Sequence, residues 1–324
     1  GRLAFRAVRE RYAKEIQIVA IHDIGDIKTN THLLKYDSAH GKFTEEIKIL
    51  SNDTFTVGTG DNLWTVKSLE GRTPPSQLPW GEMQIDIVLE STGAFRRKLV
   101  LAPDGSVQND GYDGHIRAGA KKVLLSVPSL DEIDGVIVVG VSTNDLRKEM
   151  KCISAASCTT NCLAPIVKVL MEQFEVVCGF LTTVHAFTND QIVADRTKHK
   201  DLRRARSAGI NMIPTSTRAK FVLPKVIPGL KPGSMDGLSI RVPIITGSLV
   251  EVTAVVKKSC TVAEVNGALR AATQSGPLVG ILDYTEDPIV STDIRSNPFS
   301  SIIDSISTKA IQIPTGGTLV KVLS

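Results

Sequence analysis

Short apolar runs separated by polar turns make up the first part of the chain. Leu3–Tyr12 has the periodicity of an amphipathic helix, and Glu15–Ile21 is typical of a strand that ends at His22-Asp23. A helix followed by a strand with an acidic residue at its end is the second half of a βαβ unit. Later runs of Val, Ile and Leu predict parallel strands buried on both faces, at residues 85–89, 122–126 and 136–141. The first part therefore predicts an open α/β sheet.

The pattern changes after Leu163. Apolar and polar positions alternate along Gly237–Pro243 and Ser248–Lys258, which predicts an antiparallel or mixed sheet with one polar face. Thr261 and Glu264 have the spacing of a helix capping box. A chain of 324 residues is also too long for one core. We therefore expect a first domain at residues 1–157 and an α+β second domain at residues 158–324, close to the change near Ser154.

Composition narrows the protein class. A net charge of +4 is too small to indicate nucleic-acid binding by itself, and the apolar runs are of strand length, so no membrane partner is expected. The five cysteines are few and odd in number, which favours a reducing cytoplasm over a disulfide framework. Cys158 and Cys162 lack a second Cys/His pair at ligand spacing, so no metal site is predicted.

One cysteine has the surroundings of a nucleophile. Cys158 lies in the polar run Ser157–Cys162, directly before the helical pattern Leu163–Leu170. A helix N-terminus stabilises a thiolate through its free N–H groups and dipole. His185 follows the strand-like Val176–Val184 and is the candidate base. The alternative is a cysteine packed in the core, which we expect instead for Cys162, one helical turn later.

The segment Arg196–Arg206 is strongly basic. Its guanidinium groups could bind a phosphate in a bidentate manner, or the segment could be a solvated loop. A nucleic-acid patch is disfavoured because no aromatic residues are interleaved with the charges.

Seven motifs share one family likeness. They are Ser157–Pro165, His185–Gln191, Asp201–Arg206, Ile213–Thr217, Arg241–Pro243, Leu33–Gly41 and Glu90–Gly93. In order and spacing they closely resemble the glyceraldehyde-3-phosphate dehydrogenase family, over nearly the whole chain. The resemblance implies a Rossmann-type, doubly wound parallel sheet followed by an α+β catalytic domain. It also implies a cytoplasmic, homotetrameric, NAD-dependent enzyme of glycolysis and gluconeogenesis, acting on a sugar-phosphate aldehyde and inorganic phosphate.

The resemblance also implies roles for individual residues. Cys158 would attack the aldehyde to form a thiohemiacetal and then a thioester, with His185 holding the thiolate and taking the proton. The substrate phosphate would be bound by Thr188, Asp190 and Arg241, the attacking phosphate by Ser157, Thr159 and Thr217, with Arg204 between the two. The cofactor would be contacted by Asp23, at the adenosine ribose, and by Gly1, Arg2, Thr92, Gly93 and Ser126.

The sequence departs from the family in several places. The family's first strand and Gly-rich turn are represented only by Gly1-Arg2, and its segment after Leu323 is absent from the given sequence. We therefore expect this 324-residue chain to bind NAD weakly or not at all and to be poorly stable, and calorimetric titration with NAD would test the first expectation. Arg218 stands where the family has glycine beside a phosphate site, so it either adds an anion contact or blocks the site. Ala155 replaces an asparagine, and the connection 96–118 is longer than usual.

Three other functions remain open on the sequence. An erythrose-4-phosphate dehydrogenase would share most of the scaffold. An inactive homologue acting as a binding protein is favoured by Arg218 and disfavoured by the intact pair Cys158 and His185. A Cys-His hydrolase would leave Asp23 and the α/β first half without a purpose.

Overall fold

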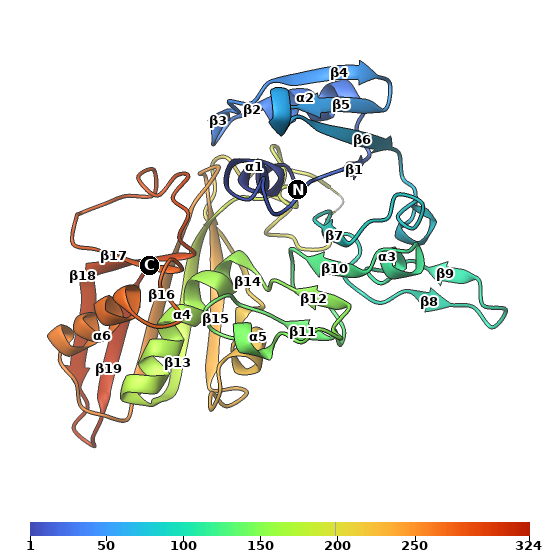
Figure 1. Ribbon diagram of the computed structural model, residues 1–324. Coiled ribbons are helices and arrows are strands. Elements are labelled where there is room, and N and C mark those ends of the chain that lie inside the picture. Colours follow the sequence, from blue (N-terminus) through green and yellow to red (C-terminus); the bar gives the residue numbers. More distant parts are fainter. Residues whose placement is uncertain (198) are drawn as a thin grey trace. The chain divides into compact units, whose positions relative to one another are not determined.

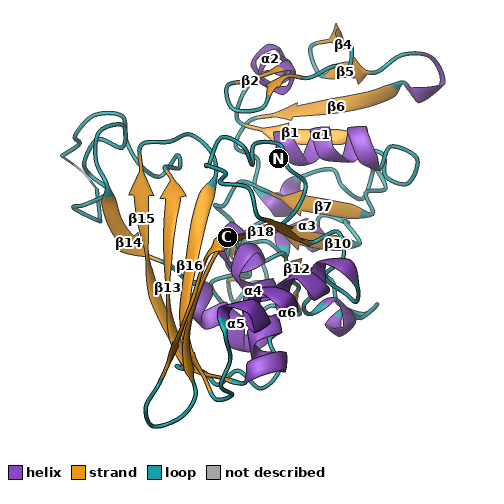
Figure 2. Cartoon of the chain, turned by 90° about the vertical axis from the view of Figure 1, so that its left-hand side faces the viewer, coloured by secondary structure: helices purple, strands orange, loops and turns teal. Residues whose placement is uncertain are grey.

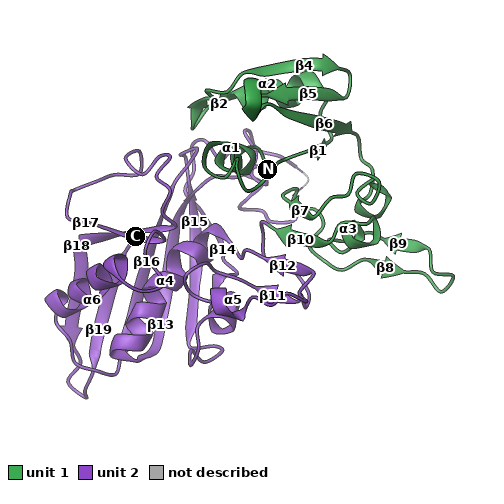
Figure 3. Ribbon diagram, in the orientation of Figure 1, with its two compact units in different colours: residues 1–125 green, residues 126–324 purple. Residues whose placement is uncertain are grey.

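The computed structural model describes residues 1–197 and 199–324. These form two compact units, residues 1–125 and 126–324 (Figure 3). Across the described residues, no helix has both the length and the apolar character needed to cross a membrane.

The first unit alternates helices with short strands (Figure 1). Its helices are α1 (Arg2–Arg11), α2 (Ile27–Lys35) and α3 (Gly114–Arg117), with 3₁₀ turns η1 (Gly60–Asn62) and η2 (Pro75–Gln77). Its strands are β1 (Ala20–Asp23), β2 (Tyr36–Asp37), β3 (Gly41–Lys42), β4 (Ile47–Ser51), β5 (Thr54–Val57), β6 (Trp64–Glu70), β7 (Ile87–Glu90), β8 (Val100–Leu101), β9 (Val107–Asn109) and β10 (Lys122–Leu125).

The first unit contains two parallel strand pairs, which belong to two different sheets. β1 runs parallel to β6, which continues into antiparallel β5 and β4, and β7 runs parallel to β10. α1 buries Phe5 in a cluster with Phe55 and Trp64. The buried Arg6 of the same helix is satisfied by donating to the carbonyl oxygens of Leu34 and Gly41, at 2.7–3.0 Å. The antiparallel extension is a feature that the sequence did not reveal.

The structure confirms the first predicted helix and corrects two strand predictions. The strand predicted over 15–21 begins only at Ala20, because its ladder with β6 extends only over Ala20–Asp23. β7 was predicted to be buried on both faces, yet Ile87 is 61% and Leu89 41% exposed. β7 is the edge strand of its sheet, and in the described chain one of its faces stays open.

The second unit consists of a large sheet and the helices that cover it. Its helices are α4 (Cys158–Phe174), α5 (Ala219–Val226) and α6 (Val262–Gln274), with the 3₁₀ turn η3 (Thr143–Asp145). Its strands are β11 (Gly135–Val136), β12 (Cys152–Ser154), β13 (Val176–Ala186), β14 (Ile213–Ser216), β15 (Met235–Val242), β16 (Ser248–Val256), β17 (Leu282–Thr285), β18 (Ser301–Gln312) and β19 (Thr318–Leu323).

The large sheet has seven strands in the order β14-β15-β13-β16-β19-β18-β17. β13 is parallel to β15 and antiparallel to β16, so the sheet is mixed, one of the two forms predicted. Figure 2 shows α4, α5 and α6 on one face of it. Because residues alternate along a strand, Val250, Val252 and Ala254 of β16 point toward these helices and are 0–1% exposed.

One predicted strand in this unit is wrong over most of its length. The apolar run 136–141 forms only the two-residue strand Gly135–Val136 and then turns. The hydroxyl of Ser142 accepts the backbone N–H of Val138 at 3.0 Å, and the backbone N–H groups of Val141 and Ser142 bond back to the Val138 carbonyl. These turn bonds replace the strand ladder that an apolar run alone suggests.

The predicted capping box of α6 is present. The Thr261 side chain accepts from the backbone N–H of Glu264, and the Glu264 carboxylate accepts from that of Thr261 at 2.8 Å. We expect Thr261→Ala to lower the free energy of unfolding by about 1 kcal/mol, because it leaves a helix-end donor unpaired. Urea unfolding would measure this, with Thr261→Ser as the control that keeps the cap. Equal destabilisation by both variants would contradict the capping role.

Candidate active site

The start of α4 presents Cys158 as its first residue. Ser157 is the N-cap, and its hydroxyl accepts the backbone N–H of Thr160 at 3.1 Å. The Asn161 side chain donates to the carbonyl oxygens of Ala155 and Ser157, at 2.8 and 2.9 Å. These bonds fix the turn before the helix, so the Cys158 sulfur lies beside the free N–H groups of the first turn. The prediction of a cysteine at a helix N-terminus is confirmed.

His185 reaches Cys158 through the register of the large sheet. It lies on β13 four residues after the buried Leu181, and it therefore projects from the face that α4 covers. Its Nε2 atom is 3.1 Å from the Cys158 sulfur. The two residues are 27 positions apart in sequence, yet α4 and β13 bring their side chains into hydrogen-bonding distance.

The surroundings of Cys158 favour its thiolate. Burial by neighbouring atoms opposes ionisation, but the hydrogen bond and charge of His185, together with Thr159, hold the pKa of Cys158 below its ordinary value. Cys162 behaves oppositely: burial raises the pKa of its thiol, which lies 3.4 Å from the Ser324 hydroxyl oxygen. The thiol of Cys158 is exposed, so it combines access with activation.

Arg241 lies next to His185 because β13 and β15 pair in parallel with these two residues in register. One guanidinium nitrogen, Nη1, is 2.6 Å from His185 Nδ1 and 3.1 Å from the Ala186 carbonyl oxygen. His185 Nδ1 is also 2.6 Å from that oxygen, so it accepts from Arg241 or donates to Ala186 according to its tautomer. Either arrangement leaves Nε2 facing the sulfur.

The guanidinium of Arg241 keeps one unused donor. Its Nε atom is buried and has no hydrogen-bond partner among the described residues. Burial lowers the pKa of Arg241 and the charge of Arg204 acts in the same direction, whereas the charge of Asp190 raises it. A partly desolvated guanidinium beside His185 is suited to binding an anion.

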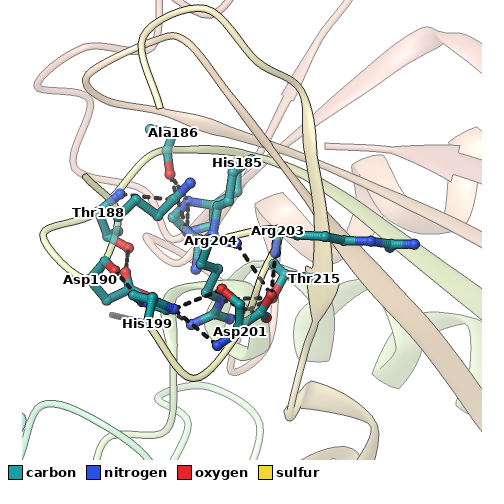
Figure 4. A network of polar contacts seen from close by, with 11 residues as sticks. His185, Ala186, Thr188, Asp190, His199, Asp201, Arg203, Arg204 and Thr215 are labelled. Atoms are coloured by element: carbon teal, nitrogen blue, oxygen red, sulfur yellow. Dashed lines mark hydrogen bonds and ion pairs between the residues drawn. The ribbon is translucent and has the colours of Figure 1, made fainter. Parts of the chain in front are cut away.

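A second cluster is built around Arg204 (Figure 4). Its Nη1 atom donates to the Asp190 carboxylate at 2.5 Å, and Nε and Nη2 donate to the Thr215 hydroxyl at 2.9 and 2.6 Å. The Thr188 hydroxyl donates to the same carboxylate. Asp201 accepts the backbone N–H of Arg204 at 3.2 Å, which is the largest cause of its lowered pKa. The structure thus connects the predicted residues Thr188, Asp190 and Arg204.

Two predicted phosphate-site residues lie at the start of α5. The Thr217 hydroxyl accepts the backbone N–H of Ala219 at 3.3 Å, and Arg218 is the N-cap residue of the helix. The Arg218 side chain is exposed and makes no side-chain hydrogen bond within the described part of the chain. Both predictions for Arg218, an added anion contact or a blocked phosphate site, therefore stay predictions.

Three residues of the Arg204 cluster are not predictable from the sequence pattern. Thr215 and Asp201 lie within the family motifs, and His199 lies within the basic segment 196–206. His199 Nδ1 accepts the backbone N–H of Asp201 at 3.0 Å, while its Nε2 lies 3.3 Å from the Asp190 carbonyl oxygen. The only local signal was Asp201 placed two and three residues before Arg203 and Arg204, the spacing at which a carboxylate caps backbone N–H groups.

The predicted cofactor residues belong mostly to the first unit. Asp23 ends β1, is exposed, and accepts the backbone N–H of Gly25 through one carboxylate oxygen. Asp23 does not cap the following helix, because Asp26 is the N-cap of α2 and accepts the backbone N–H of Thr29. Gly1 and Arg2, at the start of α1, are exposed, and no side chain caps this helix end. Thr92 and Gly93 form the turn after β7, and the exposed Ser126 begins the second unit.

These residues fit a dinucleotide. An uncapped helix N-terminus offers N–H groups to a pyrophosphate, and a free carboxylate oxygen at the end of a parallel strand suits a ribose hydroxyl. Gly93 has φ of +70°, and a Cβ there would meet no atom within 4 Å, so the turn leaves open space. No group of three potential metal ligands is found in the residues that the structure describes.

Comparison with known proteins decides the family. Residues 157–324 match the family model "Glyceraldehyde 3-phosphate dehydrogenase, C-terminal domain", and residues 1–98 match the NAD binding domain of the same family. The chain belongs to the glyceraldehyde-3-phosphate dehydrogenase family. This membership confirms the predicted family, the α/β fold class, the enzyme class and NAD as cofactor.

Several glyceraldehyde-3-phosphate dehydrogenases are similar to the chain over almost its full length. The protein of that name from Borreliella burgdorferi is 45% identical over 314 residues, covering 96% of this chain and 89% of the relative. The one from Mycobacterium avium is 45% identical, with 96% and 87% covered. The chromosomal form from Cupriavidus necator is 44% identical over 326 residues, with 99% and 90% covered. The family likeness therefore extends over both units.

Proposed function

We propose that the protein oxidises and phosphorylates glyceraldehyde 3-phosphate to 1,3-bisphosphoglycerate with NAD, as a step of glycolysis and gluconeogenesis. The observation that carries this proposal is the 3.1 Å contact between Cys158 Sγ and His185 Nε2 at the start of α4, with the Arg241 guanidinium 2.6 Å from His185 Nδ1. The names of the similar proteins support the three-carbon substrate.

The chemistry at Cys158 follows from its position. The thiolate forms a bond to the aldehyde carbon, the carbonyl electron pair moves to oxygen, and that oxygen gains a proton to give a thiohemiacetal. His185 Nε2 then removes the hydroxyl proton as the C–H bond breaks, and the carbonyl of a thioester forms. NAD supplies the acceptor for the hydride. A phosphate oxygen next attacks the thioester carbon, and the C–S bond breaks to return the thiolate and release the acyl phosphate.

Two anions must be held near one sulfur. We assign Arg241 and Thr188 to the substrate phosphate, and Ser157, Thr159 and Thr217 to the attacking phosphate. Arg204 lies between the two groups and is held by Asp190 and Thr215. A carboxylate repels a phosphate, so Asp190 acts by orienting Thr188 and Arg204.

NAD would be held by chain groups that face open space. The first-turn N–H groups of α1, at Gly1 and Arg2, would bind the pyrophosphate, and Asp23 would accept from a ribose hydroxyl. The Thr92–Gly93 turn would line the cofactor. We also propose functional domains at residues 1–157 and 158–324. The match to the catalytic-domain family model begins at residue 157, which supports this division.

Loss of Arg241 is expected to affect the phosphorylated aldehyde selectively. A charge-assisted bond to phosphate contributes roughly 1.5–3 kcal/mol, so Arg241→Ala should lower kcat/KM for glyceraldehyde 3-phosphate about ten- to a hundredfold more than for unphosphorylated glyceraldehyde. Steady-state rates with both substrates measure this ratio. The matched control is Arg203→Ala, since Figure 4 shows that side chain extending away from the Arg204 cluster. Equal losses on both aldehydes would mean that Arg241 only supports His185.

The function itself is tested by NADH formation. The chain should reduce NAD only when an aldehyde and inorganic phosphate are both present, and more efficiently with glyceraldehyde 3-phosphate than with erythrose 4-phosphate. A preference for the four-carbon sugar would support the erythrose-4-phosphate alternative. Absence of turnover with a fully alkylatable Cys158 would support the inactive binding protein, and ester hydrolysis without NAD would support the hydrolase.

The outer face of the large sheet supports self-association, and we propose a homotetramer. The register places the exposed apolar side chains of five residues on the face opposite α4 and α6: Phe180, Leu238, Leu249, Ile306 and Ile311. They are 41–69% exposed, and an apolar patch of this kind is typical of an interface. We also propose a cytoplasmic location, which the five free cysteines support.

A further inference from the structure

A buried network of hydrogen-bonded polar side chains lies in the interior of the first unit. Trp80 from the loop before β7, Glu90 at the end of β7 and His115 of α3 are each 5% exposed or less. Trp80 Nε1 donates to His115 Nδ1 at 2.9 Å, and His115 Nε2 lies 3.1 Å from one Glu90 carboxylate oxygen. None of these three residues takes part in the chemistry at Cys158.

The donor and acceptor of each hydrogen bond in this network are fixed. An indole N–H is a donor and never an acceptor, so His115 Nδ1 must be the unprotonated nitrogen. The ring proton is therefore on Nε2, which donates to Glu90 Oε2. Burial raises the pKa of Glu90, but hydrogen bonds from His115 and Thr92 outweigh it and lower the pKa overall. Glu90 is thus a carboxylate that only accepts.

The second Glu90 oxygen holds the turn that follows. Oε1 accepts the Thr92 backbone N–H at 2.7 Å and the Thr92 hydroxyl at 2.5 Å. The Thr92 oxygen in turn accepts the backbone N–H of Ala94 at 3.1 Å. The Thr92 hydroxyl is fully used within the turn, and Gly93 between these contacts has φ of +70°. The conformation of an exposed turn therefore depends on a buried carboxylate.

We propose that Glu90 is a positioning residue for NAD binding: oriented by His115 and Trp80, it fixes the Thr92–Gly93 turn that meets the cofactor. This inference rests on the proposed placement of NAD at that turn. Burying a charge costs free energy unless the charge is fully hydrogen-bonded. Here each hydrogen-bond partner also fixes the orientation of the Glu90 carboxylate. A rigid turn binds without first losing conformational freedom, which is the benefit we assign to the network.

The test variant places a hydrogen-bond donor where the Glu90 carboxylate accepts from His115. In Glu90→Gln the amide oxygen can keep both Thr92 bonds only by turning the amide nitrogen, a donor, toward the His115 Nε2–H, another donor. The ring could move its proton to Nδ1, but it would then oppose the Trp80 N–H. Adding Trp80→Phe removes this opposition and lets His115 accept from the glutamine. The double variant should therefore behave more like the wild type than Glu90→Gln does.

NAD affinity and the His115 tautomer are the readouts. We expect Glu90→Gln to raise both the KM for NAD and the Kd for NADH, measured by fluorescence, about tenfold, as for an unpaired buried group. The KM for the aldehyde and the alkylation rate of Cys158 should not change. ¹⁵N NMR should show His115 protonated at Nε2 in the wild type and at Nδ1 in the double variant. Glu82→Gln, at an exposed position of the same unit, is the matched control and should have no effect.

Defined outcomes overturn the inference. An unchanged NADH affinity in Glu90→Gln, or a double variant no better than the single one, contradicts it. If Glu90→Gln does not fold, Thr92→Val carries the test, because it removes one of the two bonds to Oε1; an unchanged NADH affinity again contradicts it. A wild-type enzyme whose rate does not depend on NAD would refute the proposed function instead, whatever the Glu90 variants do.

Discussion

Replacing Cys158 with serine is expected to lower kcat by on the order of 10⁴-fold or more, because the thioester can no longer form. A serine hydroxyl has no lowered pKa at this position and is a far weaker nucleophile than the thiolate. The substitution is isosteric and the side chain is exposed, so the free energy of unfolding should change by less than about 0.5 kcal/mol. NADH formation and urea unfolding measure the two effects.

The matched control for this prediction is Cys178→Ser. Cys178 is also exposed and free, but it lies on β13 away from His185, and its loss should leave the rate unchanged. Iodoacetamide at neutral pH should modify Cys158 before any other thiol in the wild type. A Cys158→Ser variant with substantial turnover, or faster labelling of Cys178, would show that the nucleophile has been misassigned.

Replacing His185 with asparagine should lower kcat roughly 10²- to 10⁴-fold, the usual contribution of a general base. It should also change the titration of the thiol. His185 lowers the pKa of Cys158, so the alkylation rate of the wild type should fall only at pH values below the ordinary thiol pKa of about 8.5. Without His185 the midpoint of the rate–pH profile should move upward, and less thiolate should be present at neutral pH.

The control for His185 is His32→Asn, at an exposed position of α2. It should change neither kcat nor the alkylation profile. If His185→Asn lowered kcat while the profile stayed in place, His185 would act on the hydroxyl proton without stabilising the thiolate. An unchanged kcat would remove His185 from the mechanism altogether.

Local patterns predicted the features that depend on neighbouring residues. The helix near Leu3, the capping box of Thr261 and Glu264, and the placement of Cys158 at a helix start each follow from residues within one or two turns. His185 was predicted as the base from its place after the strand-like Val176–Val184, and the family likeness supported its pairing with Cys158, 27 residues away.

The features that were missed depend on distant partners. Glu90 and His115 are 25 residues apart, and Trp80 and His115 are 35 apart, so no periodicity links them. Thr215 gains its role only from hydrogen bonds with Arg204, a loop residue 11 positions earlier, and no periodicity predicts this contact. The length of β1 was overestimated for the same reason, since the end of a strand is set by its partner in the ladder.

The two segments that carry the active-site residues differ in local stability: α4 is deeply buried, and the segment around Arg204 is not. Leu163, Ile166 and Leu170 are completely buried, so unwinding the helix that carries Cys158 would disrupt the main core of its unit. The segment around Arg204 is different, with Val193 92% and Leu202 83% exposed, and it can open at a small free-energy cost. Amide hydrogens near Arg204 should therefore exchange with solvent long before those of α4. As denaturant is added, the protein should lose its affinity for phosphate at concentrations where α4 is still folded and still stabilises the Cys158 thiolate.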